Sequence, residues 1–288
     1  MAVADRLLRS SAARFYDPDV DVDWSAPPVE GLDYILDRRC SLYGTALWDR
    51  LTPDQRRELG KHEAASVASV GLWFELILMR MLVKLAYEGD PTDPRIQYAL
   101  TETAEECRHT IMFARMTEAL GCPAYGPRPH IHRLGRILPG LTRGPAMYGS
   151  ILVAEEVTDR LQREQVDSPL IQPLVRMVNR IHIMEESRHI GFARTELLAG
   201  MAGLNRVELR YQRHLLAYVS YLITRSLVNP RVYPAVGIDP DQGRRAALAN
   251  PAYRETIRFS GEKIMPFLRE AGLVGGPGMY WWKQSFLV

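Results

Sequence analysis

Five helix-start signals divide this sequence into long segments. In each signal, a residue that can cap a helix is followed directly by proline, which suits the first helical position because the amide there has no partner within the helix. The five pairs are Thr52-Pro53, Asp93-Pro94, Ser168-Pro169, Asp239-Pro240 and Asn250-Pro251. Glycines that follow apolar-periodic stretches mark the ends. Together they predict helices over residues 53–88, 94–120, 145–166, 169–199, 204–229 and 251–271.

Helices of this length, joined by short polar turns, are typical of an antiparallel bundle. No stretch alternates polar and apolar residues as a strand would. The Gly- and Pro-rich segment 121–144 is predicted to be a loop or a short-helix connection. We therefore expect an all-α protein with a ferritin-like four-helix core over about 53–229. Additional helices flank this core, and C-terminal helices and a tail over 230–288 complete a single domain over 1–288.

Charge and composition narrow the class of protein. With 47% hydrophobic residues, the chain can bury a sizeable core, and a net charge of +2 gives no strong field for nucleic acid. The apolar window 215–223 is too short to span a bilayer, and the N-terminus lacks the apolar run of a secretory signal. Three cysteines suit a reducing compartment. We expect a cytoplasmic protein that binds neither nucleic acid nor membrane.

The segment Glu-Glu-x-Arg-His occurs twice, at 105–109 and 185–189. Each copy places a glutamate and a histidine three residues apart, on one face of a predicted helix: Glu106 with His109, and Glu186 with His189. His182 lies one turn before Glu186 on the same stripe. Charged groups that face a core are costly unless something neutralises them, and a metal ion would do so.

A two-metal site in a helical bundle also takes one inward glutamate from each of the other two helices. Glu75 is surrounded at helical spacing by small and apolar residues, and so is Glu155. The neighbouring Glu156 shares a face with Arg160 and Arg163, so it is expected to point outward. The predicted metal ligands are Glu75, Glu106, His109, Glu155, His182, Glu186 and His189.

This ligand set favours iron. Mixed oxygen and nitrogen ligands suit iron or manganese better than zinc, and four carboxylates balance two divalent ions. The same ligands leave a mixed manganese and iron site open.

Other polar residues have simpler interpretations. Arg108 and Arg188 are expected to pair with acids such as Glu105 and Glu185. The loop histidines at 130 and 132 are expected to be solvated. The aromatic C-terminus at 279–288 is expected to dock on the bundle or on a dimer partner, with pocket lining as a further option.

The complete pattern resembles the ferritin-like diiron carboxylate proteins and, within them, the p-aminobenzoate N-oxygenase family of diiron arylamine oxygenases. His182 carries the closer resemblance, because His-x-x-x-Glu-x-x-His separates this family from ferritins, desaturases and ribonucleotide reductase small subunits. The resemblance covers about residues 50–230.

The resemblance implies an oxidoreductase: a monooxygenase with two iron ions, dioxygen as co-substrate and an external electron donor. It would oxidise a small amine, such as an arylamine, to hydroxylamine, nitroso and nitro products. It also implies a homodimer. One iron would be held by Glu75, Glu106 and His109, the other by Glu155, His182 and His189, with Glu106 and Glu186 as candidate bridges.

The substrate is less clearly indicated. The family binds an aromatic carboxylate through an arginine of a late helix, for which Arg254, Arg258 and Arg269 are candidates. Asp159, one turn after Glu155, would repel a carboxylate. Two alternatives stay open: a diiron hydroxylase or desaturase that acts on carbon, and a non-catalytic ferritin-like iron-binding protein.

Overall fold

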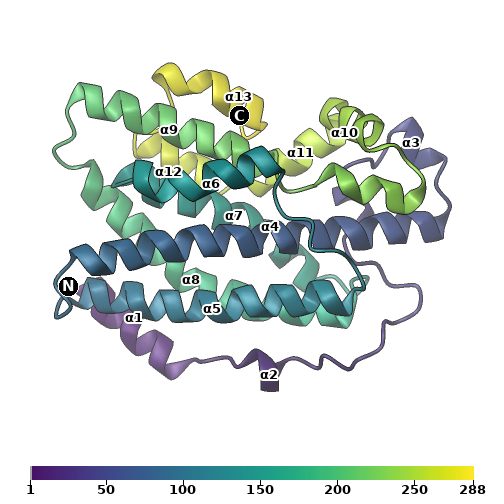
Figure 1. Ribbon diagram of the computed structural model, residues 1–288, viewed down its shortest axis with the longest axis horizontal. Coiled ribbons are helices and arrows are strands. Elements are labelled where there is room, and N and C mark those ends of the chain that lie inside the picture. The colour runs from purple at the N-terminus through teal and green to yellow at the C-terminus, as the bar shows by residue number, and fades with distance from the viewer. Residues whose placement is uncertain (1) are drawn as a thin grey trace.

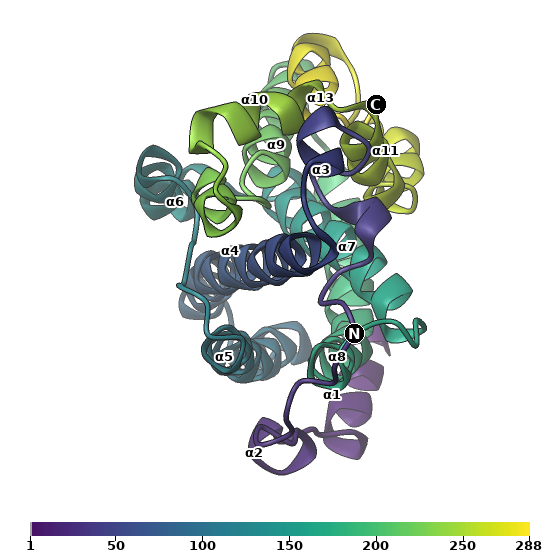
Figure 2. The same ribbon diagram turned by 90° about the vertical axis from the view of Figure 1, so that its right-hand side faces the viewer.

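Four long helices form the centre of the computed structural model, which describes residues 2–288 (Figure 1). They are α4 (Pro53–Glu88), α5 (Pro94–Ala119), α7 (Pro145–Val166) and α8 (Pro173–Met201). α4 packs along α5, and α7 along α8. Seen end-on, the four helices surround one interior (Figure 2). The predicted all-α fold with a four-helix core is confirmed.

Flanking helices cover two sides of this core (Figure 2). Against α5 and α8 lies α1 (Ala2–Ala13), which is followed by the short α2 (Pro18–Asp21). On the side of α4 and α7 lie α6 (Pro129–Leu141), α9 (Arg206–Thr224), α10 (Pro240–Ala249), α11 (Pro251–Ser260), α12 (Ile264–Glu270) and α13 (Met279–Ser285). The short α3 (Ala46–Asp49) precedes α4, and the described residues also form three 3-10 helices: Asp37–Arg39, Pro230–Val236 and Gly276–Gly278.

Four of the five predicted helix starts are confirmed. α4 begins with a capping box in which Thr52 and Gln55 exchange hydrogen bonds, and Asp93, Asp239 and Asn250 each accept a bond from an amide of the first turn. These caps satisfy amides that have no partner within the helix, so the helix ends are set by local chemistry.

The fifth start, Ser168-Pro169, is wrong. α8 begins at Pro173, because the chain before it pairs with the N-terminal segment. Asp33 and Ile171 form an isolated bridge, and the Gln172 side chain bonds the backbone of Val29 and Leu32. These distant contacts outweigh the local capping signal.

Two other helices differ from the prediction. The expected helix over 204–229 ends at Thr224, because the chain beyond it bonds α4: Ser66 donates to the Leu227 carbonyl and accepts from the Asn229 amide. The expected helix over 251–271 is broken at Gly261, where a β-carbon would lie 2.6 Å from a methyl of Leu287, so the C-terminus packs against the break. The segment 121–144 contains α6, a 13-residue helix that lies over α4. Its place in a predicted connection agrees with the short-helix alternative.

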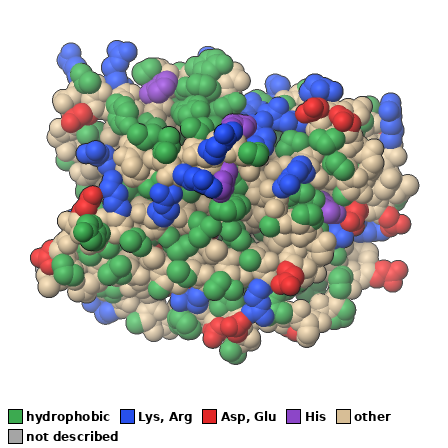
Figure 3. All heavy atoms as spheres, viewed as in Figure 1, with side chains coloured by type: hydrophobic (Ala, Val, Ile, Leu, Met, Phe, Trp, Pro, Cys, Tyr) green, Lys and Arg blue, Asp and Glu red, His purple; other side chains and the backbone are tan. Residues whose placement is uncertain are grey.

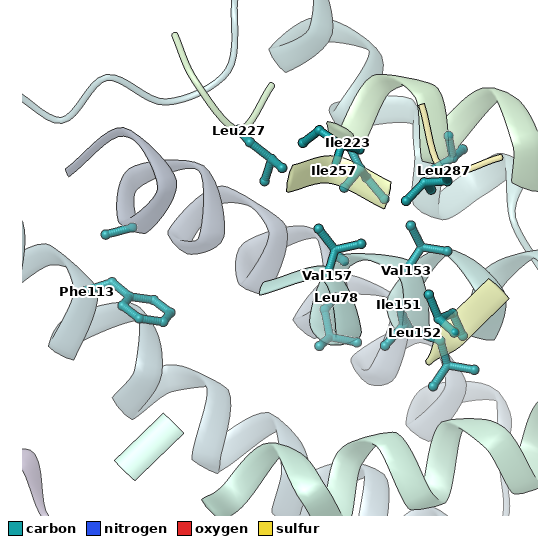
Figure 4. Packing of buried hydrophobic residues seen from close by; sticks show 14 of the residues in the cluster. Leu78, Phe113, Ile151, Leu152, Val153, Val157, Ile223, Leu227, Ile257 and Leu287 are labelled. Atoms are coloured by element: carbon teal, nitrogen blue, oxygen red, sulfur yellow. The ribbon is translucent and has the colours of Figure 1, made fainter. Parts of the chain in front are cut away.

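The hydrophobic core is continuous from the bundle into the C-terminal layer. Figure 4 shows Val153 and Val157 of α7 pointing toward Ile257 of α11 and Leu287 of the C-terminal segment. Trp282 is fully buried, and the Trp281 ring packs against α9. The aromatic C-terminus therefore docks on the helical bundle, which was one of the positions expected from the sequence.

Among residues 2–288, α4 is the one helix that is long and apolar enough to cross a membrane by length and composition. Its position argues for a core helix instead, because it is one of the four bundle helices and buries the carboxylates of Glu63 and Glu75.

Candidate metal centre

The bundle brings all seven predicted ligands into one buried cluster. No side chain in the set is more than 3% exposed. Their ligand atoms form three overlapping groups, each with atoms within 4.8 Å of one another. The groups are Glu106, His109, Glu186 and His189; Glu75, His109 and His182; and Glu155, His182 and Glu186.

The Glu-x-x-His segment of α5 faces the Glu-x-x-His segment of α8. The Nδ1 atom of His109 lies 3.0 Å from Glu106 and 3.2 Å from Glu186. The Nδ1 atom of His189 lies 2.8 Å from Glu106 and 3.0 Å from Glu186. Both ring nitrogens thus converge with both carboxylates, which is the arrangement required to share metal ions between the helices.

The opposite ring nitrogens are held by the other copy of the repeat. The Nε2 atom of His109 lies 2.8 Å from Glu185, and that of His189 lies 2.6 Å from Glu105. A carboxylate on the outer nitrogen of a ligating histidine sets its tautomer and ring orientation. The sequence analysis did not predict this role of Glu105 and Glu185. The repeated Glu-Glu pair could have indicated it, because each copy carries a second glutamate beside the proposed ligand.

The expected arginine pairing is confirmed for both copies. Arg188 donates to Glu105 at 2.9 Å, and Arg108 forms a longer ion pair with Glu185 at 3.8 Å. Glu105 therefore bridges a cation and an imidazole within the bundle interior.

The α4 and α7 side of the cluster is more open. The Nε2 atom of His182 lies 3.5 Å from Glu75 and 3.6 Å from Glu186. Its Nδ1 atom lies 2.8 Å from the side-chain oxygen of Gln162 on α7. Gln162 orients this histidine, and nothing in the local sequence pointed to it, because the contact joins different helices.

The electrostatics of the cluster are compatible with a bound cation. Burial, followed by repulsion from neighbouring carboxylates, raises the pKa of both Glu75 and Glu155 well above the usual value. Burial lowers the pKa of His182 to about 4, so this imidazole is neutral and able to ligate. One oxygen of Glu75 and one of Glu186 are buried without a hydrogen-bond partner. Divalent ions would satisfy these atoms, so the residues present fit a two-metal centre.

Two further acids of α7, Glu156 and Asp159, lie close to Glu155 in the sequence, and each pairs with an arginine. Glu156 was expected to point outward, which is wrong: it is buried and forms a bidentate pair with Arg194 of α8, with contacts of 2.7–2.9 Å. Packing of α8 against α7 supplies the arginine that makes this burial possible. Asp159 instead accepts a bond from Arg163 at 2.7 Å, which offsets its charge.

Other predicted residues lie away from the centre. His130 is exposed as expected, but the expectation for His132 is wrong, because it is half-buried and packs edge-on against Trp73 at 4.4 Å between ring centroids. Arg254 donates to the Leu248 carbonyl, and Arg258 pairs with Glu255.

The chain is similar to the family described as P-aminobenzoate N-oxygenase AurF over residues 1–272. Uncharacterized proteins of Mycobacterium tuberculosis and Mycobacterium bovis are 31% identical to it over 236 residues, which cover 79% of this chain and 68% of theirs. Among solved structures, a point mutant of an R2-like ligand-binding oxidase with an aerobically reconstituted Mn/Fe cofactor has a TM-score of 0.48 at 14% identity. That match covers 99% of this chain and 90% of the oxidase. Because the family match spans nearly the whole chain and the buried carboxylates and histidines fit a dinuclear centre, this protein belongs to the p-aminobenzoate N-oxygenase family of ferritin-like diiron oxygenases.

Proposed function

We propose that this protein oxidises the nitrogen of a small amine at the centre formed by its four inner helices. The observation that carries the proposal is the third histidine: His182 is buried beside Glu75 and held by Gln162, and it completes the pattern that resembles arylamine N-oxygenases. Family membership supports the same direction.

The first oxidation is RNH2 + O2 + 2e⁻ + 2H⁺ → RNHOH + H2O, with both electrons supplied by an external reductant. Two iron ions, when bound, would supply the activation of dioxygen that organic side chains cannot provide. As the family resemblance implies, Glu75 of α4 with Glu106 and His109 of α5 would hold one ion, and Glu155 of α7 with His182 and His189 of α8 would hold the other. Glu106 and Glu186 are candidate ligands of both ions.

The chain's own residues keep this chemistry selective. Glu105 and Glu185 hold two imidazoles in place, and the buried apolar layer around Phe113 and Met112 excludes water. Phe113 packs against the His182 ring at 4.8 Å between centroids, so this histidine is shielded from solvent on that side.

The direct test is product analysis. Protein loaded anaerobically with Fe(II) is mixed with oxygen, a chemical reductant and a panel of neutral and acidic arylamines, and products are identified by mass spectrometry with ¹⁸O2. We expect one ¹⁸O on nitrogen, and loss of product in Glu186→Ala. A label on carbon would favour a hydroxylase instead. No labelled product from fully iron-loaded protein, with iron retained, would favour a non-catalytic iron-binding protein.

We also propose a cytoplasmic homodimer that receives electrons from a separate donor protein. Sedimentation of the purified chain tests the dimer, and a monomer at micromolar concentration would contradict it.

A further inference from the structure

An apolar cavity of about 400 Å³ lies between α4, α6, α7 and α9. This volume falls within the range of small-molecule sites, roughly 300–1,000 Å³. Trp73, Leu134, Leu215 and Leu222 keep part of their surface accessible because they face this space. Of the seven proposed metal ligands, Glu155 alone lines this cavity.

Helix α6 forms the roof of the cavity. At Gly135 a β-carbon would lie 2.8 Å from a methyl of Ile77, so α6 sits directly on α4 there. Arg80 of α4 donates to the Arg136 carbonyl at 2.9 Å. These contacts hold α6 over α4 without filling the space beneath it.

The cavity reaches the metal centre at one place. Phe74, Ala154 and Glu155 line both this cavity and a smaller void of about 50 Å³. That void is also lined by Glu75 and His182. A molecule in the cavity would therefore have its inner end beside the Glu155 side chain.

The charges that line the cavity are unevenly placed. Its arginines, Arg80 and Arg136, are exposed at the roof, where water solvates them. Figure 3 shows Lys and Arg side chains gathered among hydrophobic ones on this face. Glu155 is the one acid among the described lining residues, and no lysine or buried arginine faces the interior. Arg254, Arg258 and Arg269 do not line it.

These observations disfavour a small anionic substrate with its carboxylate in the interior. A carboxylate moved into apolar surroundings without a paired cation loses its hydration, and the interior of this cavity offers neither a lysine nor a buried arginine to pair with it. An amine nitrogen is compatible with that end, because its N–H can donate to the Glu155 carboxylate.

We propose that this cavity is the substrate site and that it takes neutral amines with an apolar aromatic or alkyl body, the nitrogen lying at the Glu155 end. The proposal rests on the proposed function for the identity of the reacting group, and it excludes aminobenzoate anions as preferred substrates.

The test compares two ligands that share an amine and differ in charge: 4-aminobenzoate and its butyl ester. Binding to the iron-loaded protein is measured by calorimetry without oxygen, so no turnover is needed. We expect the ester to bind at least tenfold more tightly than the anion. Equal binding, or tighter binding of the anion, would overturn the proposal.

Variants test the location. Leu222→Trp fills the cavity and is expected to weaken ester binding at least tenfold, whereas Leu100→Trp, at an exposed position of α5, should leave it unchanged. Leu134→Arg places a cation on the inner side of the roof and is expected to shift the preference toward the anion. If both cavity variants bind like the natural chain, the ligand lies elsewhere and the proposal fails.

The two proposals fail separately. If the ester binds in the cavity but no amine is oxidised, the proposed function is wrong while the site and its ligand class stand. If the anion is bound and oxidised in preference to the ester, the function stands and this inference does not.

Discussion

The Nε2 atom of His189 on α8 lies 2.6 Å from a carboxylate oxygen of Glu105 on α5. The reciprocal pair, His109 and Glu185, is separated by 2.8 Å. Each copy of the repeated segment thus orients the histidine of the other copy. The inner nitrogens face the shared carboxylates as a consequence, so a change at Glu105 should alter metal binding without removing a ligand.

Replacing Glu105 by alanine is expected to weaken iron binding by about 10–100-fold, because the His189 ring loses the partner that fixes its tautomer and orientation. Chelator competition measures the affinity. Glu118→Ala, at an exposed glutamate of the same helix, is the matched control. An unchanged affinity in Glu105→Ala would show that the helix packing alone positions the imidazole.

His182→Ala is expected to lower the iron content by about one ion per chain and to abolish oxidation, since the second ion would lose one of its two imidazoles. Iron is measured by a colorimetric assay and by Mössbauer spectroscopy. His130→Ala, at an exposed histidine, should retain full iron. Full iron in His182→Ala would remove this residue from the ligand set.

A pH dependence of stability is expected from Glu63, which lies outside the metal centre. Burial raises its pKa to about 7, although hydrogen bonds from Ser41 act in the opposite direction. Between its ordinary pKa of 4.5 and about 7, Glu63 is protonated in the folded state and ionised in the unfolded state. The contribution of Glu63 to the free energy of unfolding therefore falls as pH rises through this range and is lost above about 7. Its size is on the order of 3 kcal/mol.

Urea denaturation of the natural chain and of Glu63→Gln at pH 5 to 8 measures this contribution. The amide stays neutral, so the stability difference should grow in favour of the variant as pH rises to about 7 and then level off. A difference that does not vary with pH would show that Glu63 is ionised throughout that range.

Arg194→Ala leaves the buried carboxylate of Glu156 without its cation. We expect the free energy of unfolding to fall by at least about 2 kcal/mol. This is below the roughly 3–5 kcal/mol of a fully buried pair, because about a third of the Arg194 side chain is exposed. Arg57→Ala, which breaks an exposed pair with Asp54, should cost less than about 1 kcal/mol. Equal losses in the two variants would contradict the assigned role.

Helix positions were predictable where local chemistry sets them. Thr52 and Asp93 cap their helices within three residues of sequence, and Glu75 shares a face with apolar neighbours because of the 3.6-residue period. The start of α8 was not predictable from Ser168, because Gln172 bonds a segment about 140 residues away.

The sequence by itself determined that long helices carry two Glu-x-x-His segments, and that Glu75, Glu155 and His182 share inward faces with them. Spacing along a helix decides which side chains lie on one face, and this property is local. Only the tertiary structure decided that Glu105 contacts His189, that Gln162 contacts His182 and that Arg194 pairs with the buried Glu156. It also decided that α6 covers an apolar cavity ending at Glu155. Such pairings depend on which helix faces which, and helical periodicity carries no information about the partner.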